Sequence, residues 1–161
     1  MDWAAKGRID MMENLNRIPD EEDADSAAAE GYINVLNWLT FQGIFPTPTG
    51  LVQASMNGHL HVLQWALDHN LEVNADIIAA SVAQGYFDIL KWSVHVGIEP
   101  NDQAMAYALE NGDIPIANWL ESYEVLPDQE MADIAAGNNQ VVSLNWLAQR
   151  NILPTQNGID N

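Results

Sequence analysis

The chain has 161 residues, and its 23 acidic side chains outnumber its 5 lysines and arginines, which gives a formal net charge of -18. Such a charge argues against direct contact with the phosphates of DNA or RNA and against anionic membrane surfaces. The absence of cysteine excludes disulfides, thiolate zinc sites and cysteine nucleophiles.

A 27-residue repeat organises the chain. Tryptophan recurs at this step five times, at Trp38, Trp65, Trp92, Trp119 and Trp146. Glycine keeps the same step at Gly31, Gly58, Gly85 and Gly112, with Asn139 in the fifth place. The run GRIDMMENL, which begins at Gly7, is a weaker copy. We therefore predict one domain, 1–161, with repeats at 7–30, 31–57, 58–84, 85–111, 112–138 and 139–161.

Each repeat is predicted to contain two helices. After each glycine the apolar residues recur with helical spacing, as Leu60, Leu63 and Trp65 do. These helices are expected to end, in chain order, near Gly43, Asn70, Gly97, Glu124 and Asn151. The N-caps of the alanine-rich helices that follow are expected at Thr47, Asn74, Asn101, Asp128 and Thr155. No segment alternates as a strand does.

A helical pair of this size cannot bury its own apolar face, so the pairs are expected to stack in a line. With 48% apolar residues the chain can bury a core in this way. The five periodic tryptophans occupy matched places in an apolar stripe, which predicts structural core rather than a stacking ladder for bases or carbohydrates. The predicted fold class is all-α, an α-solenoid of stacked helix–turn–helix repeats.

These units resemble ankyrin repeats. The best copy, TPTGLVQASMNGHLHVLQWAL at 47–67, is similar to the family's Thr-Pro start, alanine-rich first helix, Asn-Gly-His turn and Val-Leu second helix. The usual unit has about 33 residues, and the missing residues fall where the family's β-hairpin finger sits. The form is closer to the short, Trp-bearing ankyrin-like repeats of giant viruses and some protists. The resemblance implies a protein-binding scaffold whose fingers are reduced or absent.

No arrangement typical of catalysis is found. The chain lacks a glycine-rich phosphate loop, a Gly-x-Ser-x-Gly elbow and a recurring Ser/His/Asp grouping. His59 and His61 are two residues apart, so on a helix they would not face each other, and no metal site is expected. The ankyrin resemblance implies a structural role for His59 in the turn after Gly58. We therefore expect no enzyme, no catalytic residue, no cofactor and no metal.

The acidic residues are the main candidates for partner binding. They form one cluster and then recur at the loops and starts of the alanine-rich helices: Asp20, Glu21, Glu22, Asp23, Asp25, Glu72, Asp76, Glu99, Asp102, Asp128 and Glu130. Compensation of helix dipoles, worth ~0.3–1 kcal/mol per charge, explains acids near helix starts. It does not explain the scarcity of bases, and a long-range negative field for binding remains open.

Phe41 and Phe45 are a second candidate for partner binding. They flank Gly43 in the stretch 31–67, which contains no Asp, Glu, Lys or Arg. Loop aromatics in an uncharged zone are typical of a contact patch. They are equally typical of side chains that seal one end of a stack.

Three functions from different classes stay open. The favoured one is a non-enzymatic interaction module that presents an acidic surface to another protein with a basic surface. The second is an acidic nucleic-acid mimic or inhibitor that occupies the groove of a nuclease or another nucleic-acid-binding protein, as some viral antidefence proteins do. The third is an architectural segment of a longer array. Without a signal-like start or an apolar run of about 18 residues, we expect an intracellular, cytoplasmic protein, with a nuclear location also compatible.

Overall fold

The computed structural model describes residues 18–155, so the weak copy that begins at Gly7 lies outside the described residues. Within the described range the chain forms ten helices joined by short loops and contains no strand, which confirms the all-α prediction there. In chain order they are α2 (Glu21–Ala29), α3 (Ile33–Thr40), α4 (Pro48–Met56), α5 (Leu60–Asp68), α6 (Ala75–Val82), α7 (Phe87–His95), α8 (Asp102–Asn111), α9 (Ile114–Glu121), α10 (Gln129–Gly137) and α11 (Val141–Ala148).

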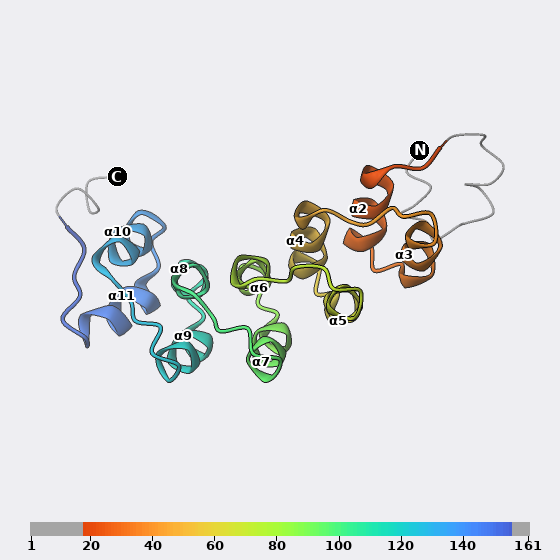
Figure 1. The fold of residues 1–161 in the computed structure, drawn as a ribbon. Coiled ribbons are helices and arrows are strands. Elements are labelled where there is room, and N and C mark those ends of the chain that lie inside the picture. Colours follow the sequence, from red (N-terminus) through yellow and green to blue (C-terminus); the bar gives the residue numbers. More distant parts are fainter. Residues whose placement is uncertain (1–17, 156–161) are drawn as a thin grey trace.

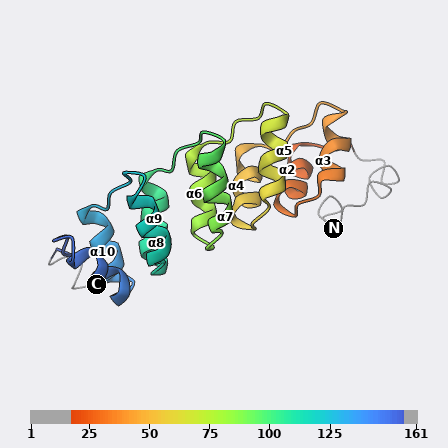
Figure 2. The ribbon, with the colours of Figure 1, turned by 90° about the horizontal axis from the view of Figure 1, so that it is seen from below.

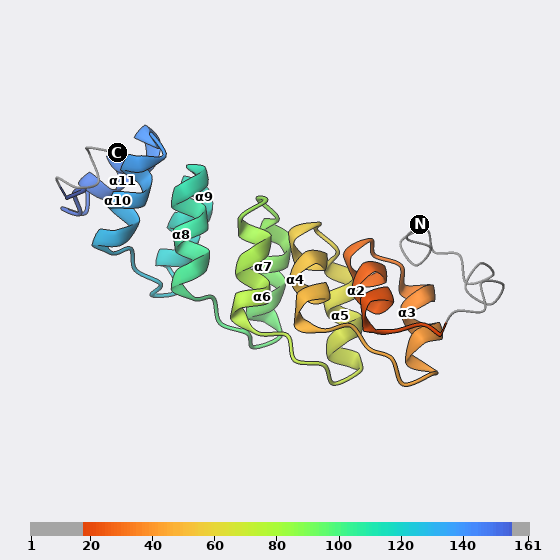
Figure 3. The same cartoon turned by 90° about the horizontal axis from the view of Figure 1, so that it is seen from above.

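The helices form two layers (Figure 1). The even-numbered helices pack against one another in sequence, and each odd-numbered helix packs against the even-numbered helix that precedes it. The even-numbered layer lies on the concave side of the array, and contact between successive odd-numbered helices is sparse. Views from below and above show helices side by side along one direction (Figures 2 and 3). The predicted stacking of neighbours in sequence order is confirmed.

Side-chain caps start the even-numbered helices. The side chains of Asn74, Asn101 and Asp128 accept hydrogen bonds from the backbone N–H groups three residues on, at 3.1, 3.2 and 2.9 Å. The Thr47 hydroxyl accepts from the Thr49 N–H at 3.2 Å. Each such cap stabilises a helix by about 0.5–2 kcal/mol. These four predicted N-caps are confirmed; the helix predicted after Thr155 lies outside the described residues.

The odd-numbered helices end where the sequence predicts. Each of the five expected terminators has a positive φ: Gly43, Asn70, Gly97, Glu124 and Asn151. Glu124, with φ 64°, is the one among them that is neither glycine nor asparagine, so its backbone is strained. At Gly58 close packing is a further reason for glycine, because a Cβ there would lie 2.6 Å from the Tyr86 ring.

Small residues let the even-numbered helices approach closely. Ala24, Ala54, Ala108 and Ala135 are fully buried between neighbours in this layer. The tryptophans of the odd-numbered helices divide into two groups. Trp65 and Trp146 are buried, at 7% and 6% exposed, whereas the other three are half-buried and pack against the core. No helix within residues 18–155 has the length and apolar content needed to cross a bilayer.

Candidate functional site

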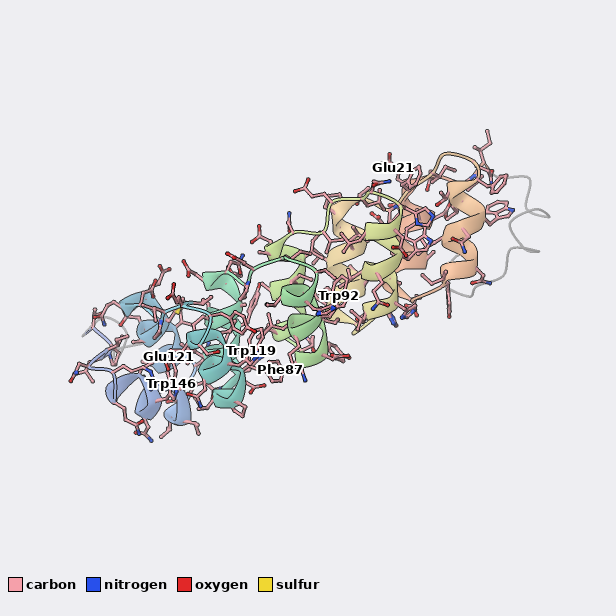
Figure 4. The ribbon with its side chains drawn as sticks, turned by 60° about the horizontal axis from the view of Figure 1, so that its bottom comes forward. Glu21, Phe87, Trp92, Trp119, Glu121 and Trp146 are labelled. Carbon is pink, nitrogen blue, oxygen red and sulfur yellow. The ribbon has the colours of Figure 1, made fainter. Side chains whose placement is uncertain are left out.

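Nine exposed carboxylates lie along the loops and first turns of the even-numbered helices. We call this set the acidic edge: Asp20, Glu21, Glu22, Glu72, Asp76, Glu99, Asp102, Asp128 and Glu130. Because α6, α8 and α10 stack in order, their acidic residues recur along one border of the array, and Glu21 is labelled at its far end in Figure 4. The structure thus brings together most of the sequence-predicted acids.

Two predicted members do not belong to this surface. Asp23 is 6% exposed and forms a capping box with Asp20, whose N–H donates to Asp23 Oδ2 at 2.9 Å. Asp25 is half-buried, and its carboxylate accepts from the backbone N–H and the hydroxyl of Thr47 at 2.6 and 2.7 Å. Both carboxylates hold helix ends in place. This corrects the sequence prediction, which grouped them with the partner-binding residues.

A pocket of about 220 Å³ opens between the starts of α8 and α10. Three carboxylates of the acidic edge stand around it, from Asp102, Asp128 and Glu130, and its apolar lining includes Met131 and Ile134. Carboxylates above an apolar floor suit the alkyl stem and charged head of a lysine or arginine. Among the described residues no three His, Asp or Glu side chains are arranged to hold a metal ion.

The two loop phenylalanines differ in their surroundings. Phe41, directly after α3, is 96% exposed. Phe45 is half-buried and packs against the core, together with Ile44. Of the two, only Phe41 lies fully at the surface.

His59 and His61 contact each other, which corrects the sequence prediction. His59 is the N-cap of α5 and has non-helical backbone angles (φ −83°, ψ 66°), so the helical spacing rule does not apply. The two rings meet edge to face, with centroids 5.5 Å apart. The His61 Nε2 lies 3.0 Å from the carbonyl oxygen of Gly31. Burial, then the nearby His61, lowers the pKa of His59, against a raising effect of Glu30.

The two buried indoles are distinguished from the half-buried ones by a hydrogen bond to the preceding repeat. The Nε1 of Trp65 donates to Asn37 Oδ1, and that of Trp146 donates to Asn118 Oδ1, each at 2.7 Å. In both pairs asparagine stands 28 residues before tryptophan. The half-buried Trp92 and Trp119 have Gln64 and Lys91 in that place. This pairing was not predicted, although the residue 28 positions before each tryptophan signals it.

A row of variable side chains lies at the ends of the odd-numbered helices, four residues after each tryptophan. We call it the outer row: Gln42, His69, Val96, Tyr123 and Arg150. Ring centroids are 4.2 Å apart for Trp65 and His69 and 4.3 Å apart for Trp119 and Tyr123. This row was not predicted either, because the predicted features rest on positions that stay constant among the repeats, and these five positions vary.

Arg150, in this row, lies 3.5 Å above the ring of Trp146 and forms two 2.7 Å hydrogen bonds with the carboxylate of Glu121. It also donates to the carbonyl oxygen of Trp146 at 2.9 Å. The hydrogen bond from Arg150 lowers the pKa of Glu121. One cation is thus held by an aromatic face, a carboxylate and a carbonyl at the end of a helix.

An aromatic cluster joins α7 to α9. The rings of Phe87 and Trp119 meet edge to face, 5.4 Å apart, and Tyr123 covers Trp119 from the following turn. Lys91 lies 4.7 Å above the Phe87 ring. Figure 4 shows Phe87, Trp92, Trp119 and Trp146 along the odd-numbered helices. Tyr123 is 44% exposed, so this side of the cluster faces solvent.

Comparison with known proteins assigns no family. A scan of the chain against family models matches none, and a search of curated proteins finds no match. The function of the chain is therefore inferred from its acidic edge.

Proposed function

We propose that this chain is a non-enzymatic protein-interaction module of ankyrin-like repeats that presents its acidic edge to a partner protein with a basic surface. The single observation that carries the proposal is the alignment of exposed carboxylates along one border of a stack of helical pairs. Such a stack offers an extended, regular face for binding. The Asn-Gly-His turn and the alanine-rich first helices support the ankyrin-like assignment.

The charge of the acidic edge exceeds what helix stability requires. Acids in a first turn each contribute roughly 0.3–1 kcal/mol. Against the nine carboxylates of the edge, the described range holds two Lys or Arg residues, Lys91 and Arg150, and both lie on odd-numbered helices. A field of one sign steers a basic partner and raises its association rate. We propose that the acidic edge steers a basic partner toward the chain in this way.

A nucleic-acid mimic is the second candidate, supported by the recurrence of an acidic pair in each of three successive repeats. Duplex DNA carries one charge per ~1.7 Å of its axis. Packed helices repeat at about 8–10 Å, so an acidic pair per repeat is a much sparser array. A groove shaped for phosphates would therefore meet few carboxylates in register, and the protein partner is favoured.

To test this function, the chain is immobilised and incubated with an extract of its source. The proteins that the chain retains are compared at about 0.01 M and 0.1 M salt. The screening length shortens from about 30 to about 10 Å over this range. The variant Glu72→Gln, Glu99→Gln, Glu130→Gln removes three charges from the acidic edge. We expect a defined basic protein that is retained by wild type at low salt and lost at higher salt and with this variant.

The matched control is Glu30→Gln, Asp88→Asn, Glu110→Gln, which removes three exposed charges outside the acidic edge. It should retain the partner. Equal loss with both variants would mean that net charge alone acts, and retention with the edge variant would contradict the proposal. Displacement of duplex DNA from a basic groove protein by the wild-type chain would instead favour the mimic.

A further inference from the structure

The seams between successive even-numbered helices are not all closed in the same way. At the seam between α2 and α4, the carboxylate of Asp25 accepts hydrogen bonds from the backbone N–H and the hydroxyl of the N-cap Thr47, at 2.6 and 2.7 Å. At the seam between α6 and α8, the carboxylate of Asp76 accepts from the side-chain amide of the N-cap Asn101 at 2.6 Å. In both seams, a donor at the start of one repeat's helix meets a carboxylate of the repeat before it.

The seam between α8 and α10 has different chemistry. Its N-cap is Asp128, and an ionised carboxylate accepts hydrogen bonds but has none to donate. The places of Asp25 and Asp76 are taken here by Ala106 and Gln103. Contact between α8 and α10 is also sparser than contact between the successive even-numbered helices before them. The pocket of about 220 Å³ lies in this more open seam.

The floor of the pocket is apolar. Met131 is buried, Ala106 is half-buried and Ile134 is 38% exposed. The small side chain of Ala106 leaves room above the floor, because the same place on α4 holds the larger Val52. The helix dipole explains acids in the first turns of α8 and α10, but it does not place apolar side chains beneath them. The pocket therefore combines two features that helix stability does not require together.

Three exposed carboxylates stand at the rim of the pocket, from Asp102, Asp128 and Glu130. The two Lys or Arg residues of the described range lie in the other layer, Lys91 on α7 and Arg150 just after α11. Carboxylates of like charge repel one another, and a cation that binds between them relieves this repulsion. Charge complementarity thus indicates that a cation from a partner occupies the pocket.

The size and lining of the pocket favour lysine. Sites for small molecules have volumes of about 300–1,000 Å³, so a pocket of about 220 Å³ suits a single side chain better. Among the described residues that line it none is aromatic, whereas the guanidinium of Arg150 lies on an aromatic ring and pairs with one carboxylate through two bonds. The ammonium group of lysine directs three donors to separate acceptors, and its four-carbon stem lies along apolar surface.

We propose that the pocket between α8 and α10 binds a lysine side chain of the partner protein, with the alkyl stem on Ala106, Met131 and Ile134 and the ammonium group among the carboxylates of the rim. This inference rests on the proposed function and adds to it a defined place on the acidic edge and the residue type bound there. The acidic edge attracts the basic partner along its length, and the pocket fixes the position of one lysine.

The first experiment uses the full chain and three small cations as probes. The n-butylammonium ion reproduces the side chain of lysine, n-propylguanidinium reproduces that of arginine, and methylammonium carries the same charge without three of the methylene groups. NMR chemical shifts of the Met131 and Ile134 methyl groups report binding in the pocket. We expect n-butylammonium to shift both with a Kd of about 1–10 mM. Methylammonium should bind about tenfold more weakly, as loss of a partly buried stem predicts, and n-propylguanidinium should also bind more weakly.

The variant Ala106→Val fills the pocket without changing the charge. Valine stands in the same place on α4, as Val52, so a helix of this layer accommodates it. We expect the variant to weaken binding of n-butylammonium about tenfold, because the floor is no longer accessible to the stem. The matched control, Ala148→Val at an exposed position of α11, should leave binding unchanged.

A second pair of variants tests the rim. Glu130→Gln removes one carboxylate of the rim and should weaken binding of n-butylammonium about threefold, the size expected of an exposed ion pair. Glu99→Gln removes a carboxylate of the acidic edge outside the pocket and should have a smaller effect. Circular dichroism checks that every variant is folded.

Equal binding of n-butylammonium and methylammonium would overturn the inference, because charge alone would then attract both. Unchanged binding to Ala106→Val, or equal weakening by Glu130→Gln and Glu99→Gln, would overturn it too. Tighter binding of n-propylguanidinium would overturn the assignment to lysine.

The partner retained from the extract separates this inference from the proposed function. Ala106→Val should retain less of that partner than Ala148→Val does. Equal retention by these two variants, with loss of the partner on the Glu72→Gln, Glu99→Gln, Glu130→Gln variant, would refute the lysine pocket and leave the proposed function standing. Full retention by that triple variant would refute the proposed function itself.

Discussion

The indole Nε1 of Trp146 donates a 2.7 Å hydrogen bond to Asn118 Oδ1 and so joins α11 to α9. Asn37 and Trp65 form the same bond between α3 and α5. Contact between successive odd-numbered helices is otherwise sparse. A buried N–H without a partner costs about 1–3 kcal/mol, so each bond permits an indole to be buried where it would otherwise stay half-exposed.

Replacement of Asn118 by alanine should therefore destabilise the fold by about 1–3 kcal/mol, because the N–H of Trp146 loses its acceptor. Urea unfolding followed by tryptophan fluorescence measures the change. Asn145 occupies the equivalent place one repeat later and is exposed, so Asn145→Ala should change stability by less than about 0.5 kcal/mol. Equal effects of the two variants would contradict a specific role for the indole bond.

The converse change gives the indole of Trp92 an acceptor like the one that Trp65 and Trp146 have. Gln64 stands 28 residues before the half-buried Trp92, and Gln64→Asn supplies the shorter amide found at Asn37 and Asn118. We expect a gain of about 0.5–1.5 kcal/mol in the free energy of unfolding and a blue shift of tryptophan emission. Gln53→Asn, an exposed change of the same kind on α4, should give neither. An unchanged emission spectrum for Gln64→Asn would show that the amide does not decide burial.

Substitutions at two turn glycines distinguish the energetic cost of backbone strain from that of close packing. Gly58 and Gly43 have nearly equal φ values, 77° and 78°, but a Cβ would meet the Tyr86 ring at Gly58 and nothing within 4 Å at Gly43. Gly43→Ala should cost about 1–2 kcal/mol, the price of left-handed backbone alone. Gly58→Ala should cost more, and the difference should shrink in a Tyr86→Ala background. Thermal or urea unfolding tests this, and equal costs would rule out a packing role.

Protonation of His59 should weaken the fold as the pH falls. Burial and the neighbouring His61 lower the pKa of His59, with Glu30 acting in the opposite direction. The folded state thus resists protonation more than the unfolded state, whose histidine pKa is about 6.5. The contribution of neutral His59 is complete above that pH and is lost as the pH falls through the lower folded-state pKa.

Urea unfolding between about pH 7.5 and pH 5 should show wild type losing more stability than His59→Gln. Parallel curves for wild type and His59→Gln would mean that the carboxylates alone set the pH dependence.

The sequence predicted features that depend on neighbours in the chain. The 27-residue step, the caps at Asn74 and Asp128 and the end at Gly97 follow from local backbone chemistry, so they can be inferred without a structure. The contact between His59 and His61 was missed because the helical spacing rule assumes that both residues are helical, and His59 is a cap.

Pairings between repeats could not be foreseen in this way. Asp25 binds the cap Thr47, and Asp133 binds Thr155, each pair 22 residues apart. The residue equivalent to Asp25 one repeat later is Val52, and the cap that follows it is Asn74 rather than threonine. A carboxylate thus accompanies a threonine cap because the hydroxyl can donate to it. From the sequence alone, Asp25 cannot be distinguished from an acidic residue on the surface.

The sequence by itself determined the helices, their caps and the order in which they stack, because these follow from spacings within one repeat. Only the tertiary structure decided that Asp25 binds a neighbouring cap and that Trp65 and Trp146 are the buried indoles. Each of those outcomes depends on a partner 22 to 28 residues away, across a seam between two helical pairs. The energy of such a contact exists only once the neighbouring repeat is in place.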